Sequence, residues 1–238
     1  MNKFIIIGGG LTGLSCAFKL VHMEILPENI EIFEARQEIG SPTRSPGIAS
    51  FSNNIDFLLN NIKLQKLTLL NNENNFLTFR REWLEKSLLI HLTDLGCKIN
   101  LKETINENKL KNIISFIKEK SIIINCAGKK KSSSGFPGDF TNFINSKIQL
   151  ISIKPKKLVN WYGYLSIEKN KTIIKKTFIS INKKDGLNEI WTCDLDKITK
   201  EKYKFIEIIK SSFPPTLDDI LANNTIDRGF LLANKAIQ

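Results

Sequence analysis

Histidine is scarce in this chain of 238 residues, which contains only His22 and His91. Neither histidine has a second metal ligand four residues away, and no two of the four cysteines form a CxxC pair. The sequence therefore predicts no metal site, and it offers few candidates for catalysis by histidine. We expect the cysteines to be reduced, partly buried thiols. They are Cys16, Cys97, Cys126 and Cys193.

Long apolar runs are also missing. No segment approaches the roughly 18–20 consecutive apolar residues of a membrane-spanning helix, so we expect no transmembrane segment. The apolar run Phe4–Ile7 ends at three glycines, and no small-residue cleavage site follows a long apolar region. This pattern argues against a secretory signal peptide and favours a cytoplasmic protein.

Arginine is rare although the chain is strongly basic. The 35 lysines and arginines outnumber the 24 acidic residues by 11, and five of the 35 are arginine, which leaves 35 − 5 = 30 lysines. Abundant lysine, asparagine and isoleucine are as typical of an AT-rich genome as of a selected basic surface. The charge leaves peripheral contact with acidic membranes open. No basic motif interleaved with aromatic residues indicates specific nucleic-acid binding.

A glycine-rich βαβ pattern opens the chain. An apolar, β-branched run, typical of a strand buried on both faces of a parallel sheet, directly precedes Gly8-x-Gly10-x-x-Gly13. A predicted amphipathic helix follows, and then a second predicted strand, Ile30–Phe33, which ends at Glu34. This order predicts a Rossmann-type dinucleotide-binding unit.

Each residue of the motif has a physical task. Gly8 permits the tight turn from strand to helix, and Gly13 allows the helix to pack closely against the strand. Gly10 has no side chain, so a pyrophosphate can approach the backbone there. The backbone N–H groups at the start of the helix, at Leu11 and Thr12, are expected to hold the phosphates. A glycine-rich turn that binds nothing is the alternative.

Glu34 is the predicted ribose acid. It follows Gly8 by 26 residues, at the end of the second predicted strand. A carboxylate there accepts hydrogen bonds from the ribose hydroxyls of adenosine and repels a 2′-phosphate, which disfavours NADP.

The sequence changes character after residue 128, where a lysine- and serine-rich stretch begins. We expect an α/β fold in which residues 1–135 form the Rossmann-type part. Residues 136–238 are expected to form a smaller, mostly antiparallel β region for substrate or as a lid, with C-terminal helices that could complete the first part. In the first part the patterns predict helices at 55–62, 82–95 and 109–120, a hairpin around 71–75, and strands at 97–101 and 121–125. In the second part they predict strands at 148–153, 161–167, 172–181 and 189–193, a hairpin turn at 182–186, and helices at 200–211, 217–222 and 230–236.

The segment after the second strand identifies the dinucleotide by resemblance. Ile32–Gly40 resembles the extended FAD fingerprint, in which a glycine follows the ribose acid a few residues later. The continuation Glu38–Gly47 resembles the same region of geranylgeranyl-reductase-like flavoproteins, which are relatives of the aromatic hydroxylases. The resemblance implies a Rossmann-type FAD-binding domain and FAD as the cofactor.

The same resemblance assigns places to two arginines. It implies that Arg36 lies against the adenosine and Arg44 near the flavin side of the pocket, because a guanidinium binds phosphate with its planar fork and stacks on rings. The reductases often carry a cysteine after this second arginine, where the chain has Ser45. A reductase activity that uses that cysteine is therefore in doubt.

Two further segments resemble the same superfamily. The run Arg81–Leu88 resembles an arginine-led helix beside the FAD, which implies that Arg81 lies near the ribityl chain or pyrophosphate. The neighbouring Arg80 is interpreted as a solvated surface charge. Ile122–Gly128 resembles the strand and glycine that return under the cofactor, which implies a place for Gly128 in the site, although a plain buried strand explains these residues nearly as well.

The flavin half of the site is incompletely marked. The related flavoproteins carry a late Gly-Asp motif, and Gly138-Asp139, the only such dipeptide, comes too early. The chain is therefore a compact flavoprotein, a protein that needs a second subunit to complete the flavin pocket, or a derivative that has lost catalysis. We expect an FAD-binding oxidoreductase, of reductase or monooxygenase type, acting on a small molecule. The alternatives are a non-catalytic or partner-dependent dinucleotide-binding protein and an NAD-dependent dehydrogenase.

Catalytic residues cannot be named from the sequence. The aromatic residues of the β region suit an apolar substrate, but core packing explains them at least as well. They are Trp161, Tyr162, Tyr164, Phe178 and Trp191.

Overall fold

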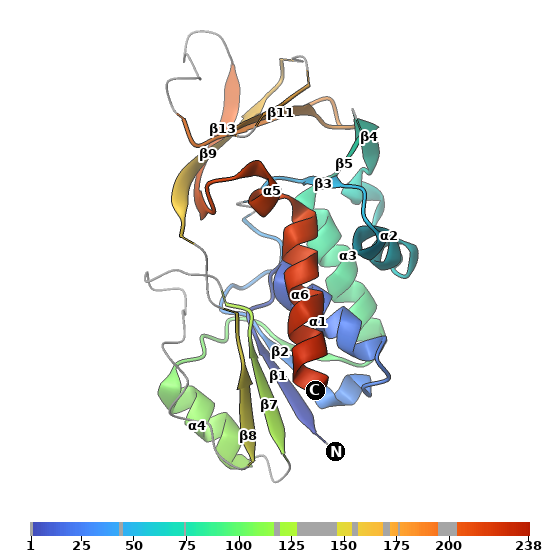
Figure 1. The fold of residues 1–238 in the computed structure, drawn as a ribbon, viewed down its shortest axis with the longest axis vertical. Coiled ribbons are helices and arrows are strands. Elements are labelled where there is room, and N and C mark those ends of the chain that lie inside the picture. Colours follow the sequence, from blue (N-terminus) through green and yellow to red (C-terminus); the bar gives the residue numbers. More distant parts are fainter. Residues whose placement is uncertain are drawn as a thin grey trace. The chain divides into compact units, whose positions relative to one another are not determined.

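The computed structural model shown in Figure 1 describes residues 2–42, 45–73, 75–116, 120–127, 147–153, 157–168, 172–175, 177–194 and 204–238. Its contacts divide the chain into two compact units that alternate along the sequence. Unit 1 comprises Met1–Ser41, Glu85–Pro155 and Ile226–Gln238, and unit 2 comprises Pro42–Leu84 and Lys156–Thr225. The predicted boundary at residue 135 lies outside the described residues.

Unit 1 is built on a parallel sheet of five strands in the order β6-β2-β1-β7-β8. All four neighbouring pairs run parallel. Both faces of this sheet are covered by protein, which explains why the central strands are almost continuously apolar. The strands are β1 (Lys3–Ile7), β2 (Ile30–Phe33), β6 (Lys98–Asn100), β7 (Ser121–Asn125) and β8 (Ile148–Ile151).

Helices cover the two faces of this sheet in unit 1. On one face, Leu110 of α4 (Glu107–Phe116) packs into an apolar cluster with Ile5 and Ile123 of the central strands. On the other face lies α1 (Leu11–Val21), which follows β1 directly. The C-terminal helix α6 (Ala222–Ile237) packs on α1, where the rings of Phe18 and Phe230 stack with centroids 6.1 Å apart. A short turn of 3-10 helix, η1 (Pro27–Asn29), leads into β2.

Unit 2 contains an antiparallel sheet in the order β10-β11-β12-β9-β13 and a three-stranded sheet in the order β3-β5-β4. The strands of the first are β9 (Val159–Ser166), β10 (Ile173–Lys175), β11 (Phe178–Asn182), β12 (Asn188–Thr192) and β13 (Phe205–Phe213). Those of the second are β3 (Ile48–Ser50), β4 (Asn71–Glu73) and β5 (Phe76–Thr78). The unit also contains α2 (Asn53–Asn60), η2 (Lys66–Thr68) and α5 (Leu217–Ile220), while α3 (Arg81–Asp94) begins in unit 2 and continues in unit 1.

Two tryptophans form the centre of the unit 2 core. Trp161 and Trp191 are fully buried and pack with isoleucines of β3 and β11. A Cβ atom on Gly163 would lie 2.7 Å from the ring of Trp191, so only glycine fits beside it. The indole N–H of Trp161 donates to the carbonyl of Pro214 at 3.0 Å. Core packing therefore accounts for both tryptophans, which were considered as substrate contacts.

The predicted α/β class is confirmed, with a parallel sheet, antiparallel sheets and C-terminal helices. Three predictions of elements are wrong. Ile148–Ile151 pairs in parallel with β7 and so belongs to the Rossmann sheet, not to the antiparallel region. The helix predicted at 200–211 is wrong over its described part, which belongs to the edge strand β13 and pairs with β9. The single strand predicted at 172–181 is a pair of antiparallel strands, β10 and β11.

Candidate functional site

The turn between β1 and α1 requires glycine at its first position. Gly8 has φ +106°, a left-handed conformation that side-chain-bearing residues rarely adopt. Its N–H donates to the carbonyl of Phe33 on β2 at 2.8 Å. A Cβ atom on Gly8 would also lie 2.8 Å from the backbone of Cys126 and Ala127, after β7. The predicted tight turn is therefore present, and it is held between the two strands that flank β1.

Gly13 is required for a different reason. It lies in the first turn of α1, and a Cβ atom there would be 1.9 Å from the carbonyl oxygen of Gly8 and 3.3 Å from Ile6. The helix can approach the turn this closely only because residue 13 has no side chain. The packing role predicted for this glycine matches the geometry.

Gly10 differs from both, because the space in front of it is open. It is the N-cap of α1, with φ −74° and ψ 179°, values that any residue can adopt, and no side chain caps the helix. A Cβ atom on Gly10 would meet nothing within 4 Å. The backbone N–H groups of a first helical turn point outward along the axis and carry partial positive charge. A larger residue at position 10 would therefore extend its side chain into the open space in front of this helix N-terminus.

Glu34 lies beside the turn that leads into α1, directly after β2. Its carboxylate is buried and accepts hydrogen bonds from the Gly9 N–H through Oε2 (2.8 Å) and from the Arg36 N–H and Nε through Oε1 (both 2.9 Å). A carboxylate has about four acceptor positions, so one remains on Oε2 for a further hydroxyl. The contact with ribose stays a prediction.

The Glu34–Arg36 ion pair keeps both of its side chains charged. Burial raises the pKa of Glu34, but the hydrogen bonds and positive charge of Arg36, together with the Gly9 N–H, outweigh burial and hold that pKa below its ordinary value. Burial lowers the pKa of Arg36, and the Glu34 carboxylate more than reverses this. Glu34 is therefore ionised at neutral pH, as a ribose acid must be.

Arg81 is the first residue of α3 and is 5% exposed. It precedes Leu84 and Leu88 on one side of the helix, and both leucines are fully buried. The predicted inward direction of Arg81 is thus confirmed, whereas its contact with a cofactor stays a prediction. The interpretation of Arg80 as a solvated charge is wrong, because its half-buried guanidinium pairs with Asp185.

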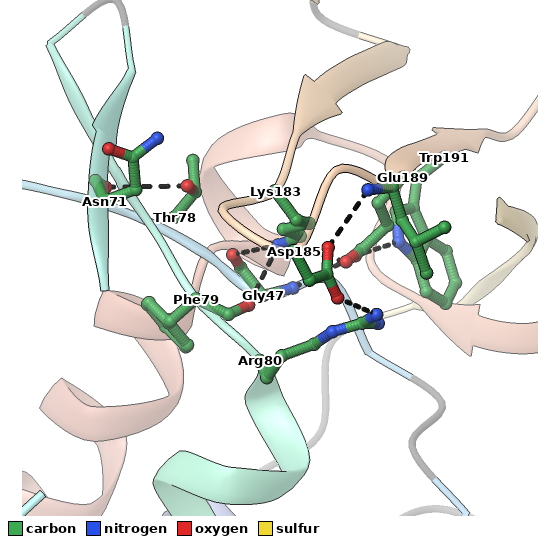
Figure 2. A network of polar contacts seen from close by, with 10 residues as sticks. Gly47, Asn71, Thr78, Phe79, Arg80, Lys183, Asp185, Glu189 and Trp191 are labelled. Atoms are coloured by element: carbon green, nitrogen blue, oxygen red, sulfur yellow. Dashed lines mark hydrogen bonds and ion pairs between the residues drawn. The ribbon is translucent and has the colours of Figure 1, made fainter. Parts of the chain in front are cut away.

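Figure 2 shows a buried network in unit 2 that the sequence analysis missed. The Lys183 ammonium is bound by the carbonyls of Gly47 (2.5 Å) and Phe79 (2.9 Å) and by Oε2 of Glu189 (3.0 Å). Oε1 of Glu189 accepts from the Gly47 N–H (3.1 Å) and from the Trp191 indole (2.6 Å). Burial lowers the pKa of Lys183, an effect that Glu189 opposes. In the sequence, Glu189 alone pointed to this network, because an acidic side chain within a buried strand needs a charged or hydrogen-bonding partner.

Several predicted features cannot be placed. Arg44, Gly128 and Gly138-Asp139 lie outside the described residues. In the part of the chain that the structure describes, no three histidine, cysteine or acidic side chains gather in a group that could hold a metal ion. None of the described helices has the length and apolar character needed to cross a membrane.

Comparison with known proteins gives structural matches only. No protein-family model matches the chain, and no curated protein does. A geranylgeranyl bacteriochlorophyll reductase-like protein from Thermoplasma acidophilum superposes with a TM-score of 0.63 at 12% identity, over 98% of this chain and 77% of that one. A flavoprotein/dehydrogenase from Cytophaga hutchinsonii gives 0.56 at 11% identity, over 99% and 78%.

A third similar structure is aklavinone-11 hydroxylase in a complex with FAD and aklavinone, with a TM-score of 0.54 at 10% identity, over 98% of this chain and 61% of that one. At such identities the likeness establishes the fold. The chain therefore shares the Rossmann-type fold of these proteins, and the expected fold is confirmed.

Proposed function

We propose that this chain binds FAD at the Gly8–Gly13 turn and acts as a flavin-dependent oxidoreductase of the reductase or monooxygenase type on a small organic molecule. One observation carries the proposal. The N-terminus of α1 opens onto free space at Gly10, whereas Gly8 and Gly13, the other two glycines of the motif, are enclosed by backbone. The buried Glu34 carboxylate binds the N–H of Gly9, the residue before Gly10. This arrangement fits the diphosphate and ribose of an adenine dinucleotide.

The chain's own residues divide the binding between them. The N–H groups at the start of α1, at Leu11 and Thr12, would hold the diphosphate, and the close packing at Gly13 fixes this helix end against the turn after β1. Glu34 accepts from a ribose hydroxyl and repels a 2′-phosphate. Arg36, already paired with Glu34, would lie against the adenosine, since a guanidinium can stack on a ring. When bound, the flavin itself supplies the hydride or electron transfer.

FAD is favoured over NAD by the segment that follows Glu34. Ile39 is buried, its Cδ1 lying 3.1 Å from the position of a Cβ atom on Gly9, and Gly40 has φ +81°. The fingerprint segment therefore folds back on the phosphate turn, and its left-handed bend falls on a glycine. The similarity of the fold to flavoproteins supports the same choice. Arg44, Arg81 and Gly128 are proposed as further cofactor contacts, and a second subunit at the flavin pocket is left as a prediction.

The test is the absorption spectrum of the purified protein, before and after addition of FAD and removal of the excess. We expect a visible flavin band that is retained on gel filtration and bleached by NADH, NADPH or a substrate under anaerobic conditions. A protein that retains NAD but no FAD would support the dehydrogenase alternative. Retained FAD that none of these reductants bleaches would support the non-catalytic alternative, and a protein that retains neither nucleotide would refute the proposal.

A further inference from the structure

Two free thiols of unit 1 meet beside the Gly8–Gly13 turn. Cys16 lies in α1 and is fully buried, whereas Cys126 directly follows β7 and is partly exposed. A hydrogen bond joins the two side chains. The residues are 126 − 16 = 110 positions apart in the sequence, so only the fold brings their sulfur atoms together.

Backbone packing around Gly8 holds the two cysteines in place. The Cys126 N–H donates to the Ile7 carbonyl at 2.8 Å, and a Cβ atom on Gly8 would lie 2.8 Å from the Cys126 carbonyl. A Cβ atom on Gly13 would lie 1.9 Å from the Gly8 oxygen. Cys16 follows Gly13 by three residues and so lies on the same side of α1. The helix and the end of β7 are thus both packed on Gly8, and each brings one thiol.

The two thiols differ in their access to solvent. Cys16 is 0% exposed, and α6 covers its backbone, because a Cβ atom on Gly229 would lie 2.9 Å from the Cys16 nitrogen. Burial and the hydrogen bond to Cys126 raise the pKa of the Cys16 thiol well above its ordinary value, so Cys16 is uncharged at neutral pH. Cys126 is the member of the pair that a dissolved reagent reaches. An accessible cysteine beside a second, resolving cysteine is the arrangement of redox-sensing thiols.

We propose that Cys16 and Cys126 are an oxidation site, at which hydrogen peroxide forms a reversible disulfide between α1 and the end of β7. First, the Cys126 sulfur attacks one peroxide oxygen, the O–O bond breaks, and Cys126 becomes a sulfenic acid as water leaves. Second, the Cys16 sulfur attacks the sulfenic sulfur, loses its proton and displaces a second water. The two sulfurs together lose two electrons, which the peroxide takes up. Because the side chains already touch, the second step is intramolecular.

The test is oxidation of the purified full-length protein by hydrogen peroxide. The remaining thiols are alkylated, and disulfides are located by peptide mass spectrometry with and without dithiothreitol. We expect a Cys16–Cys126 linkage that dithiothreitol removes. Dimedone, which captures sulfenic acids, should label Cys126 at least about tenfold more in Cys16→Ala than in the wild type, because an oriented intramolecular partner outcompetes a dissolved reagent. Cys97→Ala removes another buried cysteine of unit 1 and is the matched control, in which Cys126 should be labelled as in the wild type.

The wild-type protein alone can overturn the proposal, so the result does not depend on a variant that folds. Cys16 and Cys126 that both stay free after peroxide has oxidised the partly exposed Cys193 would overturn it. A disulfide from Cys126 to any cysteine other than Cys16 would do the same.

The order of the two steps has its own test in Cys126→Ser. Cys16 should stay reduced in this variant, because its buried sulfur is oxidised only through Cys126. Oxidation of Cys16 at the wild-type rate would contradict the role given to Cys126. No step involves FAD, so these results neither support nor weaken the proposed function.

Discussion

Substitutions at Gly13 and Gly10, three residues apart at the start of α1, should differ in their effect on stability: the first should destabilise the fold, and the second should leave it nearly unchanged. In Gly13→Ala the new Cβ atom lies 1.9 Å from the Gly8 oxygen, so the helix must move by at least 1.1 Å for that contact to reach 3.0 Å. Gly8 cannot retreat, because its N–H is bound to Phe33 and its other side touches the backbone of Cys126.

The magnitude follows from two opposing contributions. Overpacking a tight interior typically costs about 1–3 kcal/mol and occasionally more, and this contact is with backbone, which cannot rotate away. Replacing glycine by alanine in a helix returns about 1 kcal/mol. Since α1 is also confined by α6, where a Cβ atom on Gly229 would lie 2.5 Å from the Thr12 oxygen, we expect the upper end of the cost. The free energy of unfolding should fall by about 2 kcal/mol, which lowers Tm by roughly 4–8 °C in a protein of this size.

Gly10→Val should leave stability nearly unchanged and abolish FAD binding. Its backbone conformation suits valine and nothing lies within 4 Å of the new Cβ atom, so the free energy of unfolding should change by less than about 1 kcal/mol. FAD binding should be lost, because the side chain occupies the space of the diphosphate. Thermal denaturation followed by circular dichroism, with flavin fluorescence for binding, measures both. A Gly13→Ala variant with the Tm of the wild type would refute the packing role of Gly13, and a Gly10→Val variant with wild-type FAD affinity would refute the diphosphate site at Gly10.

Three further predictions concern charged residues. Glu34→Ala should weaken FAD binding by about 1–3 kcal/mol in a fluorescence titration, the cost of lost hydrogen bonds to a charged group, and unchanged affinity would remove Glu34 from the site. The pKa of Glu34 is lower in the folded state than in the unfolded state. The stabilisation that ionised Glu34 gives the fold is therefore complete above about pH 4.3 and is lost as the pH falls through the folded-state pKa. In urea unfolding, the difference in the free energy of unfolding between the wild type and Glu34→Gln should shrink below about pH 4. Arg81→Ala should lose about 2–5 kcal/mol of FAD affinity, whereas Arg80→Ala, which breaks only a partly exposed ion pair with Asp185, should leave flavin occupancy unchanged. Equal occupancy in the two arginine variants would contradict the place assigned to Arg81.

The phosphate turn was predictable because its constraints are local. Gly8, Gly10 and Gly13 lie within six residues, and the space at Gly10 and Gly13 depends only on β1, α1 and the turn between them. The left-handed φ of Gly8 is local too, although its backbone also touches Cys126 and Ala127 after β7. Glu34 was predictable for the same reason, since the length of the βαβ unit fixes where its second strand ends. The direction of Arg81 followed from the helical spacing of Leu84 and Leu88.

Features that depend on distant partners were not predictable. β8 reads as any short apolar strand, and only its pairing with β7 places it in the parallel sheet. β13 carries lysine and glutamate that suit a helix, and it is a strand because β9 offers it an edge. Lys183 could not be distinguished from the other lysines of a lysine-rich chain, because the carbonyls that bind it come from residues more than a hundred positions away.

The central claim, that the Gly8–Gly13 turn holds FAD, is tested most directly by titrating FAD into the cofactor-free wild-type protein and following the flavin fluorescence to saturation. We predict one saturable site per chain, competed by ADP-ribose because the adenosine and diphosphate are bound at α1 and Glu34, and no saturable site in Gly10→Val. A wild-type protein that shows no saturable binding, or a Gly10→Val variant that binds FAD with wild-type affinity, would contradict it.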